Sequence, residues 1–516
     1  MLDPKEEDLE KLAETCLSTA RQIKEYLAAN NQPPLTFDAD GPAFFPSATP
    51  EVQHARLDLR AAAMRLYHLA SGPDEVVSWH VYHCAHDLNA FRYVQHYNIA
   101  SAVPTTSGAS ISYGDLARQL SLDASQLRQM LRQLMTIHVF QEPSPGQVSH
   151  TASSRLLTHW GVGAFNSFVA EDTFPAVARQ IEALERWGHG RPEPNRAALN
   201  LFYDTDLPMY EYYECDGQVE TEPNKEIDST NKSNNNSTST STSMNKPDND
   251  DTTTTNKPTP SDTITPSTTT TSSSSTTTSR RERFSRLMTY MASTPIMSNA
   301  HIAHGFDWSS LPPGSTVVDI AGNVGHSAIP IAQANATAKI VVQDLPKIVA
   351  RAVDPSTSVI PPELRPRFTF MPHDFYSLQP VRGAAVYFLR MILHDYSDPY
   401  AMKILRAVVP SMAPESRIVI MDQVMPPAVG LVPDPVERMM RTQDLQMMML
   451  TNAKERDAGE WDDLLRKAGD GLVEGVFGHS GLQGKRKRLG IMNIQTPPGS
   501  TMSLIEVGFV DEGDEE

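Results

Sequence analysis

An acidic residue and two glycines after an apolar segment are the first residues whose types and spacing could do chemistry. Asp319 lies within the apolar segment Thr316–Ala321, and Gly322 and Gly325 follow this segment. Glycines at this place let a strand turn sharply into a helix and let the backbone approach a ligand. The three-glycine spacing that seats a pyrophosphate is absent, and Asp319 would repel a phosphate but attract an amino group. The pattern therefore favours a cationic nucleoside that carries no phosphate.

A second acidic residue, Asp344, follows the next apolar segment and lies nineteen residues after Gly325. A carboxylate at this position can accept hydrogen bonds from both hydroxyls of a ribose. Taken alone, an aspartate at the end of a strand is more often a helix cap than a ribose ligand. In this order and at this spacing, however, the two motifs together favour S-adenosylmethionine (SAM) as the cofactor.

These residues can meet if the apolar segments form one sheet. Between residues 316 and 422, short apolar segments alternate with helical ones. The predicted strands are Thr316–Ala321, Ala338–Gln343, Ala384–Leu389 and Arg417–Asp422, and the predicted helices are Gly325–Ala334 and Pro399–Ser411. This alternation is typical of an α/β fold with a doubly wound parallel sheet, whose ligands lie at the carboxyl ends of the strands.

The N-terminal part of the chain is expected to be helical and to contain a winged helix. Apolar residues at helical spacing predict helices over Leu9–Leu27 and Ala55–Leu69, and a helix-turn-helix over 112–135. The expected strands of the wing are Ile137–Gln141 and Gln147–Thr151. Three arginines against two aspartates give this region a weak electrostatic footprint for phosphate contacts. We therefore expect no nucleic-acid partner.

A segment between the two halves has the composition of a disordered insertion. From Ser229 to Ser279, 38 of 51 residues are Ser, Thr or Asn. Such a segment cannot bury enough apolar surface to offset the entropy lost on ordering. We therefore expect it to divide the chain without forming a domain.

Composition limits the classes of partner and compartment. The 516 residues include 44 Lys and Arg against 62 Asp and Glu, a net charge of −18, which disfavours binding to nucleic acid or to an anionic membrane. Cys16, Cys84 and Cys215 are far apart and predict neither a disulfide scaffold nor a zinc site. The N-terminus lacks a secretory signal pattern, and no apolar run is long enough to span a membrane. A soluble, cytoplasmic protein is expected.

A longer motif connects the third predicted strand to a known family. Residues 387–398, Tyr-Phe-Leu-Arg-Met-Ile-Leu-His-Asp-Tyr-Ser-Asp, resemble the signature of the SAM-dependent O-methyltransferases related to plant caffeate and isoflavone enzymes, and are most similar to the fungal polyketide-modifying branch. The resemblance covers most of the chain, up to a last turn at Pro497–Ser500 and a last strand at Met502–Val507. It implies a Rossmann-like methyltransferase domain preceded by a helical dimerisation domain, and hence a homodimer.

This interpretation divides the chain into five parts. They are a winged-helix dimerisation domain (1–165), connecting helices (166–216), the Ser/Thr/Asn-rich insertion (217–282), the methyltransferase domain (283–510) and an acidic tail (511–516).

The resemblance also implies roles for individual residues. Asp319, Gly322 and Gly325 would line the methionine end of SAM. Asp344 would bind its ribose, and Asp374 and Phe375 would contact its adenine. The family usually has three consecutive glycines in the loop after the first strand, whereas this chain has Ala321 and Asn323 at two of those positions. The positions that match the family's cofactor motifs are Asp319, Gly322, Gly325, Asp344, Asp374, Phe375 and Arg390.

His394 is the expected general base. Methylation of a phenol requires removal of its proton, and an imidazole with a pKa near neutrality can accept it. A lone histidine is more often a structural residue, but the His-Asp-Tyr-Ser-Asp context favours catalysis. Asp422 and Glu455 match two acidic positions that flank the histidine in relatives, where a carboxylate on the far imidazole nitrogen would fix its tautomer. The sequence offers no second cluster of metal ligands, so no metal is expected.

A methionine-rich segment, 446–450, precedes Glu455 and could form a wall for an aromatic substrate, because thioethers adapt to flat shapes. Met448 and Asn452 are the expected substrate-binding residues, although core packing is equally expected for any single methionine. The leading hypothesis is methylation of a phenolic or enolic hydroxyl of an aromatic, polyketide-derived small molecule. Two alternatives stay open: a catalytically silent subunit of a biosynthetic complex, and a winged-helix regulator that senses a small molecule.

Overall fold

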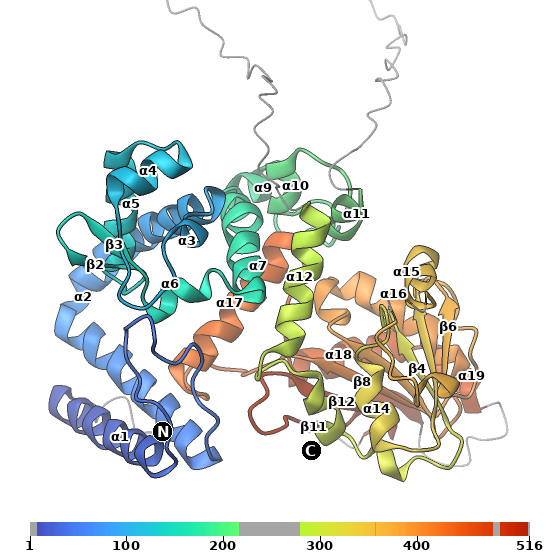
Figure 1. Cartoon of the computed structure of the whole chain (residues 1–516). Helices are drawn as coiled ribbons and strands as arrows, with labels where there is room; N and C mark the ends of the chain where they lie inside the picture. The colour runs from blue at the N-terminus through green and yellow to red at the C-terminus, as the bar shows by residue number, and fades with distance from the viewer. Residues whose placement is uncertain (1–7, 216–278, 355, 357, 478–485, 514–516) are drawn as a thin grey trace, which may run out of the picture.

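In the computed structural model, the helical half (the described residues from 9 to 293) and the half that contains the central sheet (the described residues from 299 to 511) occupy different parts of the molecule (Figure 1). The residues that the structure describes are 8–215, 279–354, 356, 358–477 and 486–513. The predicted insertion, except for residues 279–282, and the last three residues of the predicted acidic tail therefore lie outside the described residues. Of the helices in the described part of the chain, none is both long and apolar enough to cross a membrane.

Two long helices begin the chain, and both predicted helices are confirmed. The first, α1, spans Leu9–Ala29. The second, α2, spans Pro50–His96, further than expected, and is kinked at Gly72, which has φ +78° directly before Pro73. A short helix, α3, follows at Ile99–Ala102.

The predicted helix-turn-helix and wing come next. Their elements are β1 (Ile111–Ser112), α4 (Tyr113–Leu120), α5 (Ala124–Met135), β2 (Gln141–Ser144) and β3 (Gln147–Ser149), with the strands in the order β1-β3-β2. The apolar face of α5 is buried, as a helix-turn-helix requires. The expected wing strand Ile137–Gln141 is wrong, because the chain turns through positive φ at His138 and Phe140 and the strand begins at Gln141.

Short helices connect the winged helix to the sheet. They are α6 (Ala152–Leu156), α7 (Trp160–Phe168), α8 (Phe174–Val177), α9 (Gln180–Trp187), α10 (Ala198–Tyr203), α11 (Met209–Glu214) and α12 (Arg280–Ser293). The predicted domain boundaries after residues 165 and 282 fall inside α7 and α12. Figure 1 shows α12 between the helical half and the sheet. Met449 and Leu450 of α17 (Asp434–Thr451) pack into the apolar cluster of α10, α11 and α12, so the two halves share a core.

Seven strands form the central sheet, in the order β11-β12-β8-β7-β4-β5-β6. Their bounds are β4 (Thr316–Ile320), β5 (Lys339–Asp344), β6 (Phe368–Pro372), β7 (Val386–Arg390), β8 (Arg417–Asp422), β11 (Lys487–Gln495) and β12 (Ser503–Asp511). The five neighbouring strands β8, β7, β4, β5 and β6 are parallel to one another. Strand β12 runs antiparallel to β8, and β11 runs antiparallel to β12. The predicted doubly wound α/β fold is confirmed, with an antiparallel pair added at one edge.

Helices cover both faces of the sheet. They are α13 (Ile302–Gly305), α14 (Ala328–Ala334), α15 (Pro346–Ala352), α16 (Asp398–Val408), α18 (Ala458–Gly469) and α19 (Val473–Phe477). Neighbouring residues of one strand, Val317 and Val318, belong to different apolar clusters, because successive side chains of a strand point to opposite faces. The predicted helix Gly325–Ala334 starts three residues later, since the loop after β4 continues to Ser327. Strand β6 was not predicted. It lies at the edge of the sheet and is only partly buried, so its sequence lacks the continuous apolar pattern of the buried strands.

Candidate active site

Charged side chains lie at the carboxyl ends of four neighbouring parallel strands. Asp319 is in β4, Asp344 ends β5, Arg390 ends β7 and Asp422 ends β8. The sheet order places β8, β7, β4 and β5 next to one another, so these charges line one edge, where ligands bind in open α/β sheets. Within the described part of the chain, no group of three or more His, Cys, Asp and Glu side chains is arranged to hold a metal ion.

The loop after β4 keeps a glycine-like backbone although two of its residues are not glycine. Ala321 and Asn323 have φ +55° and +52°, and Gly325 has φ +89°. Glycine fits best at 322, because a Cβ on Gly322 would collide with the buried carboxylate of Asp319 and force that side chain to move. A left-handed alanine costs roughly 1–2 kcal/mol, whereas asparagine adopts this conformation more readily. The two replacements therefore preserve the turn.

Asp319 has a buried carboxyl group near the carboxyl end of β4. The residue is 1% exposed, and its Oδ2 has no hydrogen-bond partner among the described residues. Burial raises the pKa of Asp319 to about 7; the charge of Asp344 adds to the rise and Arg390 opposes it. A buried carboxylate of this kind is stabilised by a nearby cation. Asp319 therefore fits the amino group of SAM.

Asp344 connects the loop after β4 to the start of α15. Its Oδ2 accepts a hydrogen bond from the N–H of Asn323 at 2.8 Å, and its Oδ1 from the N–H of Leu345 at 2.7 Å. Burial raises the pKa of Asp344, and the two hydrogen bonds oppose the rise. Each carboxylate oxygen has a second lone pair, so Asp344 can still accept hydrogen bonds from ribose hydroxyls. Asp374 and Phe375 follow the neighbouring strand β6; Asp374 is exposed and Phe375 is half-buried.

Arg390 lies between Asp319 and Asp422 in the order of the strand ends. Its Nη2 donates to the carbonyl of Met297 at 2.8 Å, and its Nε has no hydrogen-bond partner among the described residues. Burial lowers the pKa of Arg390 to about 10, although Asp422 and Asp319 favour the charged form. Arg390 is therefore protonated at neutral pH and partly balances the carboxylates on either side.

His394 is held between two carboxylates. It lies in a single turn, Leu393–Asp395, shortly after β7. Its Nδ1 is 2.8 Å from Oε1 of Glu455, and its Nε2 is 3.6 Å from Oδ1 of Asp395. Burial by itself lowers the pKa of His394, but the charges of Asp395, Glu455 and Asp422 outweigh it and raise the pKa to about 10. The expectation of a pKa near neutrality is therefore wrong for the free protein, in which the imidazole is protonated at pH 7.

Asp422 influences His394 through its charge. Both carboxylate oxygens of Asp422 are buried and have no hydrogen-bond partner among the described residues. Burial raises the pKa of Asp422 to about 7, and the imidazolium of His394 opposes the rise. The structure thus brings Glu455, but not Asp422, into hydrogen-bond contact with the imidazole.

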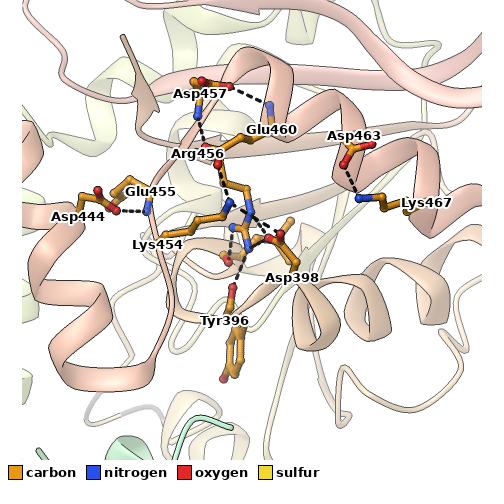
Figure 2. A network of polar contacts seen from close by, with 11 residues as sticks. Tyr396, Asp398, Asp444, Lys454, Glu455, Arg456, Asp457, Glu460, Asp463 and Lys467 are labelled. Atoms are coloured by element: carbon orange, nitrogen blue, oxygen red, sulfur yellow. Dashed lines mark hydrogen bonds and ion pairs between the residues drawn. The ribbon is translucent and has the colours of Figure 1, made fainter. Parts of the chain in front are cut away.

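Arg456 fixes the turn that carries the histidine (Figure 2). The side chain of Arg456 is fully buried; its Nη1 donates to the carbonyl of Leu393 at 3.0 Å and its Nη2 to that of Tyr396 at 2.8 Å. Its Nε donates to Oδ1 of Asp398 at 2.9 Å. Because the two carbonyls belong to residues on either side of His394, Arg456 holds the turn at both ends.

Glu455 is positioned by the segments on either side of it. Its N–H donates to Oδ1 of Asp444 on α17 at 2.9 Å, as Figure 2 shows. The next residue begins β10 (Arg456–Asp457), which pairs in parallel with β9 (Val424–Met425), two residues after Asp422. The surroundings of His394 are therefore assembled from segments far apart in the sequence.

Three further residues belong to this site, and the sequence did not predict a role for them: Asp395, Tyr210 and Arg456. Asp395 and Arg456 are direct neighbours of His394 and Glu455, so adjacency was an available signal. Tyr210 of α11 donates a hydrogen bond to Oδ2 of Asp395 across a separation of 185 residues, and no local pattern reveals such a contact.

The predicted substrate residues lie at the C-terminal end of α17. Met448 is half-buried, and its neighbours Met447 and Met449 pack in the apolar cluster shared by the two halves. Asn452 ends the helix with φ +54°, and its Nδ2 donates to the carbonyl of Glu193 at 2.9 Å. The amide of Asn452 therefore connects α17 to the segment before α10.

Comparison with known proteins gives the family. Residues 266–470 match the O-methyltransferase domain family. The O-methyltransferase pgmB of Aspergillus terreus is 31% identical over 504 residues, which cover 97% of this chain and 95% of that protein. The chain belongs to the O-methyltransferase family. It is a SAM-dependent O-methyltransferase, as the resemblance implied, and this favours the enzyme over a winged-helix regulator.

Further relatives and solved structures agree with the fold. The O-methyltransferase bik3 of Gibberella fujikuroi is 29% identical and covers 97% of this chain and 92% of its own length. The structure of OxaC in complex with sinefungin and meleagrin has a TM-score of 0.64 at 17% identity, covering 97% of this chain and 98% of that one. A structure described as a pericyclic reaction enzyme has a TM-score of 0.60 at 19% identity, covering 97% and 100%. At such identities the structural likeness establishes the fold alone.

Proposed function

We propose that this enzyme methylates a phenolic or enolic hydroxyl of an aromatic, polyketide-derived secondary metabolite, and that His394 is the general base. The observation that carries the proposal is the contact of Nδ1 of His394 with Glu455 at 2.8 Å, beside the strand ends that fit the cofactor. With the proton of Nδ1 directed to Glu455, Nε2 is left to exchange a proton with the acceptor.

The basicity of His394 suits a phenol better than an aliphatic alcohol. Against the effect of burial, three carboxylates raise the pKa of His394 to about 10, and the pKa of a phenol such as tyrosine is also about 10. Proton transfer between groups of similar pKa is nearly balanced, whereas an aliphatic hydroxyl is a far weaker acid. Since few His394 side chains are neutral at pH 7, a cationic ligand nearby should activate the base by lowering its pKa.

The strand ends are proposed to bind SAM, which supplies an electrophilic methyl group on a sulfonium. Oδ2 of Asp319, which has no hydrogen-bond partner among the described residues, supports a contact with the amino group, and the remaining lone pairs of Asp344 support a contact with the ribose. Met448 and Asn452 are proposed for the acceptor side. The residues proposed for the cofactor are Asp319, Gly322, Gly325, Asp344, Asp374, Phe375 and Arg390.

We also propose a homodimer formed through the N-terminal half. Large apolar side chains on α2 are exposed: Val77 and Val81 by 70% and Trp79 by 51%. A second copy covering this helix would remove the apolar surface from water. Light scattering should give twice the mass of one chain, and Val81→Asp should shift the protein towards the monomer. A wild-type protein that stays monomeric would contradict the proposal.

Incubation of the purified protein with SAM and a panel of phenolic polyketides, followed by mass spectrometry, tests the reaction. We expect at least one phenol to gain a methyl group on oxygen, and aliphatic alcohols of similar size to gain none. His394→Gln is the matched control, because glutamine keeps polar groups but cannot act as the base. Gain of a methyl group also distinguishes transfer from a pericyclic rearrangement, which leaves the mass unchanged. Equal methylation of aliphatic alcohols would contradict the acceptor class.

A further inference from the structure

Helix α11 belongs to the helical half, yet it contacts the site of the sheet at two places. The hydroxyl of Tyr210 donates to Oδ2 of Asp395, beside His394. One helical turn later, Oε2 of Glu214 lies 2.9 Å from Nζ of Lys347 at the start of α15. Residues four apart lie on the same face of a helix, so one face of α11 is turned towards the strand ends.

Tyr210 reaches from the accessible surface to the buried acid. Asp395 is 5% exposed, whereas Tyr210, whose hydroxyl bonds to it, is 38% exposed. Tyr210 is therefore partly accessible as a residue, while its hydroxyl contacts a carboxylate that is buried. The ring of Tyr210 packs edge-on against Phe284 of α12, at 5.8 Å between ring centroids. The orientation of Tyr210 is therefore fixed by contacts at both its tip and its side.

The hydrogen bond from Tyr210 decides which way Asp395 faces. Because Oδ2 is bonded to Tyr210, the other oxygen, Oδ1, is left towards Nε2 of His394, at 3.6 Å. This is the nitrogen opposite the one that Glu455 contacts. The acceptor hydroxyl must reach the same nitrogen if His394 is the base.

We infer that Tyr210 is a positioning residue for the catalytic base: its hydroxyl keeps the carboxylate of Asp395 turned towards Nε2 of His394, the nitrogen that would exchange a proton with the acceptor. This inference rests on the proposed function, which makes His394 the base. It gives the helical half a direct part in the reaction, through a residue that lies 185 positions before Asp395.

The charges around Asp395 set the direction of the expected effect. Asp395 faces His394 and Tyr396 on its own segment, Tyr210 on α11, Glu455 before β10 and Asp422 at the end of β8. Burial raises the pKa of Asp395, and His394 and the hydrogen bond from Tyr210 oppose the rise. Without that hydrogen bond, Asp395 is less readily ionised, so the imidazolium of His394 loses part of its stabilisation and its pKa falls.

The test compares Tyr210→Phe with Tyr213→Phe, the same change on the same helix. The hydroxyl of Tyr213 is buried and has no hydrogen-bond partner among the described residues, so its removal controls for the loss of a tyrosine hydroxyl from α11. The readout is exchange of the C2 proton of His394 for deuterium across a pH series, followed peptide by peptide by mass spectrometry. It requires neither SAM nor an acceptor, so its result is independent of whether the proposed reaction is found.

We expect the pKa of His394 to fall by roughly one unit in Tyr210→Phe and to stay at the wild-type value in Tyr213→Phe. In Asp395→Asn the pKa of His394 should fall as well, and adding Tyr210→Phe to that variant should cause no further change. A merely structural tyrosine would lower the melting temperature without moving the titration of His394. An unmoved pKa in Tyr210→Phe, an equal shift in Tyr213→Phe, or additive shifts with Asp395→Asn would overturn the inference.

Discussion

The site has two sides: the cofactor side consists of the strand ends and the loop after β4, and the base side consists of His394 and the residues around it. The two sides differ in how far apart in the sequence their contacting residues lie. On the cofactor side, the bond between Asn323 and Asp344 joins residues 21 positions apart, and the strand ends supply the remaining groups. On the base side, His394 and Glu455 are 61 positions apart, and Tyr210 and Asp395 are 185 positions apart. Contacts between neighbouring strand ends build the first, and contacts between segments far apart in the sequence build the second.

This difference predicts that the two sides can be damaged separately. A substitution on the base side should slow methyl transfer while SAM still binds. A substitution on the cofactor side should weaken SAM binding while turnover at saturating SAM is retained. If both kinds of substitution changed both quantities equally, the division would be wrong.

The largest expected effect is that of His394→Gln. Loss of a general base should lower turnover by roughly 10²–10⁴-fold and leave the dissociation constant of SAM nearly unchanged. Burial lowers the pKa of His394, but the nearby carboxylates outweigh this effect and raise the pKa to about 10 in the free protein. Because only the neutral imidazole accepts a proton, wild-type kcat/KM should rise as the pH approaches this pKa. That rise should be absent from His394→Gln. Titration calorimetry with SAM and a pH series of methylation rates measure the two quantities.

The same difference explains what the sequence could predict. Strand β4, strand β5 and the position of Asp344 follow from local hydrophobic pattern and spacing, so they could be predicted. The contact of Tyr210 with Asp395 depends on how the helical half packs on the sheet, which no local pattern encodes. The protonation state of His394 was predicted wrongly for the same reason: two of the carboxylates that raise its pKa, those of Glu455 and Asp422, come from other segments.

On the cofactor side, Asp344→Ala should have the next largest effect. A charge-assisted hydrogen bond contributes about 1.5–3 kcal/mol, so the dissociation constant of SAM should rise roughly 10- to 100-fold. Turnover at saturating SAM should change far less than in His394→Gln. Asp374→Ala is a control on the neighbouring strand end, because Asp374 is exposed and its loss should weaken binding less. Titration calorimetry that finds wild-type SAM affinity in Asp344→Ala would contradict the ribose assignment.

Arg456→Lys tests whether the base side depends on the position of its turn. Lysine keeps the charge, but its single ammonium group cannot reach three acceptors arranged for a guanidinium. We expect a loss of about 2–3 kcal/mol in the free energy of unfolding and a roughly 10-fold fall in turnover, with SAM affinity retained. Urea unfolding and methylation rates provide the measurements. Arg466→Lys is the control, because Arg466 is exposed and pairs with Asp463 on the surface of α18; an equal loss in both variants would exclude a special role for Arg456.

The smallest expected effect lies in the loop after β4, where Ala321→Gly should stabilise the protein. Ala321 has φ +55°, a conformation that costs alanine roughly 1–2 kcal/mol and glycine almost nothing. Glycine also makes the unfolded chain more flexible, which cancels roughly 0.5–1 kcal/mol of the gain, so the net increase in the free energy of unfolding should be about 0.5–1 kcal/mol. Asn323→Gly is the matched control, because asparagine at φ +52° is less strained and should gain less. Urea unfolding of the two variants compares them directly. A loss of stability in Ala321→Gly would mean that packing of the alanine methyl outweighs its backbone strain, and that the loop after β4 depends on packing as well as on backbone conformation.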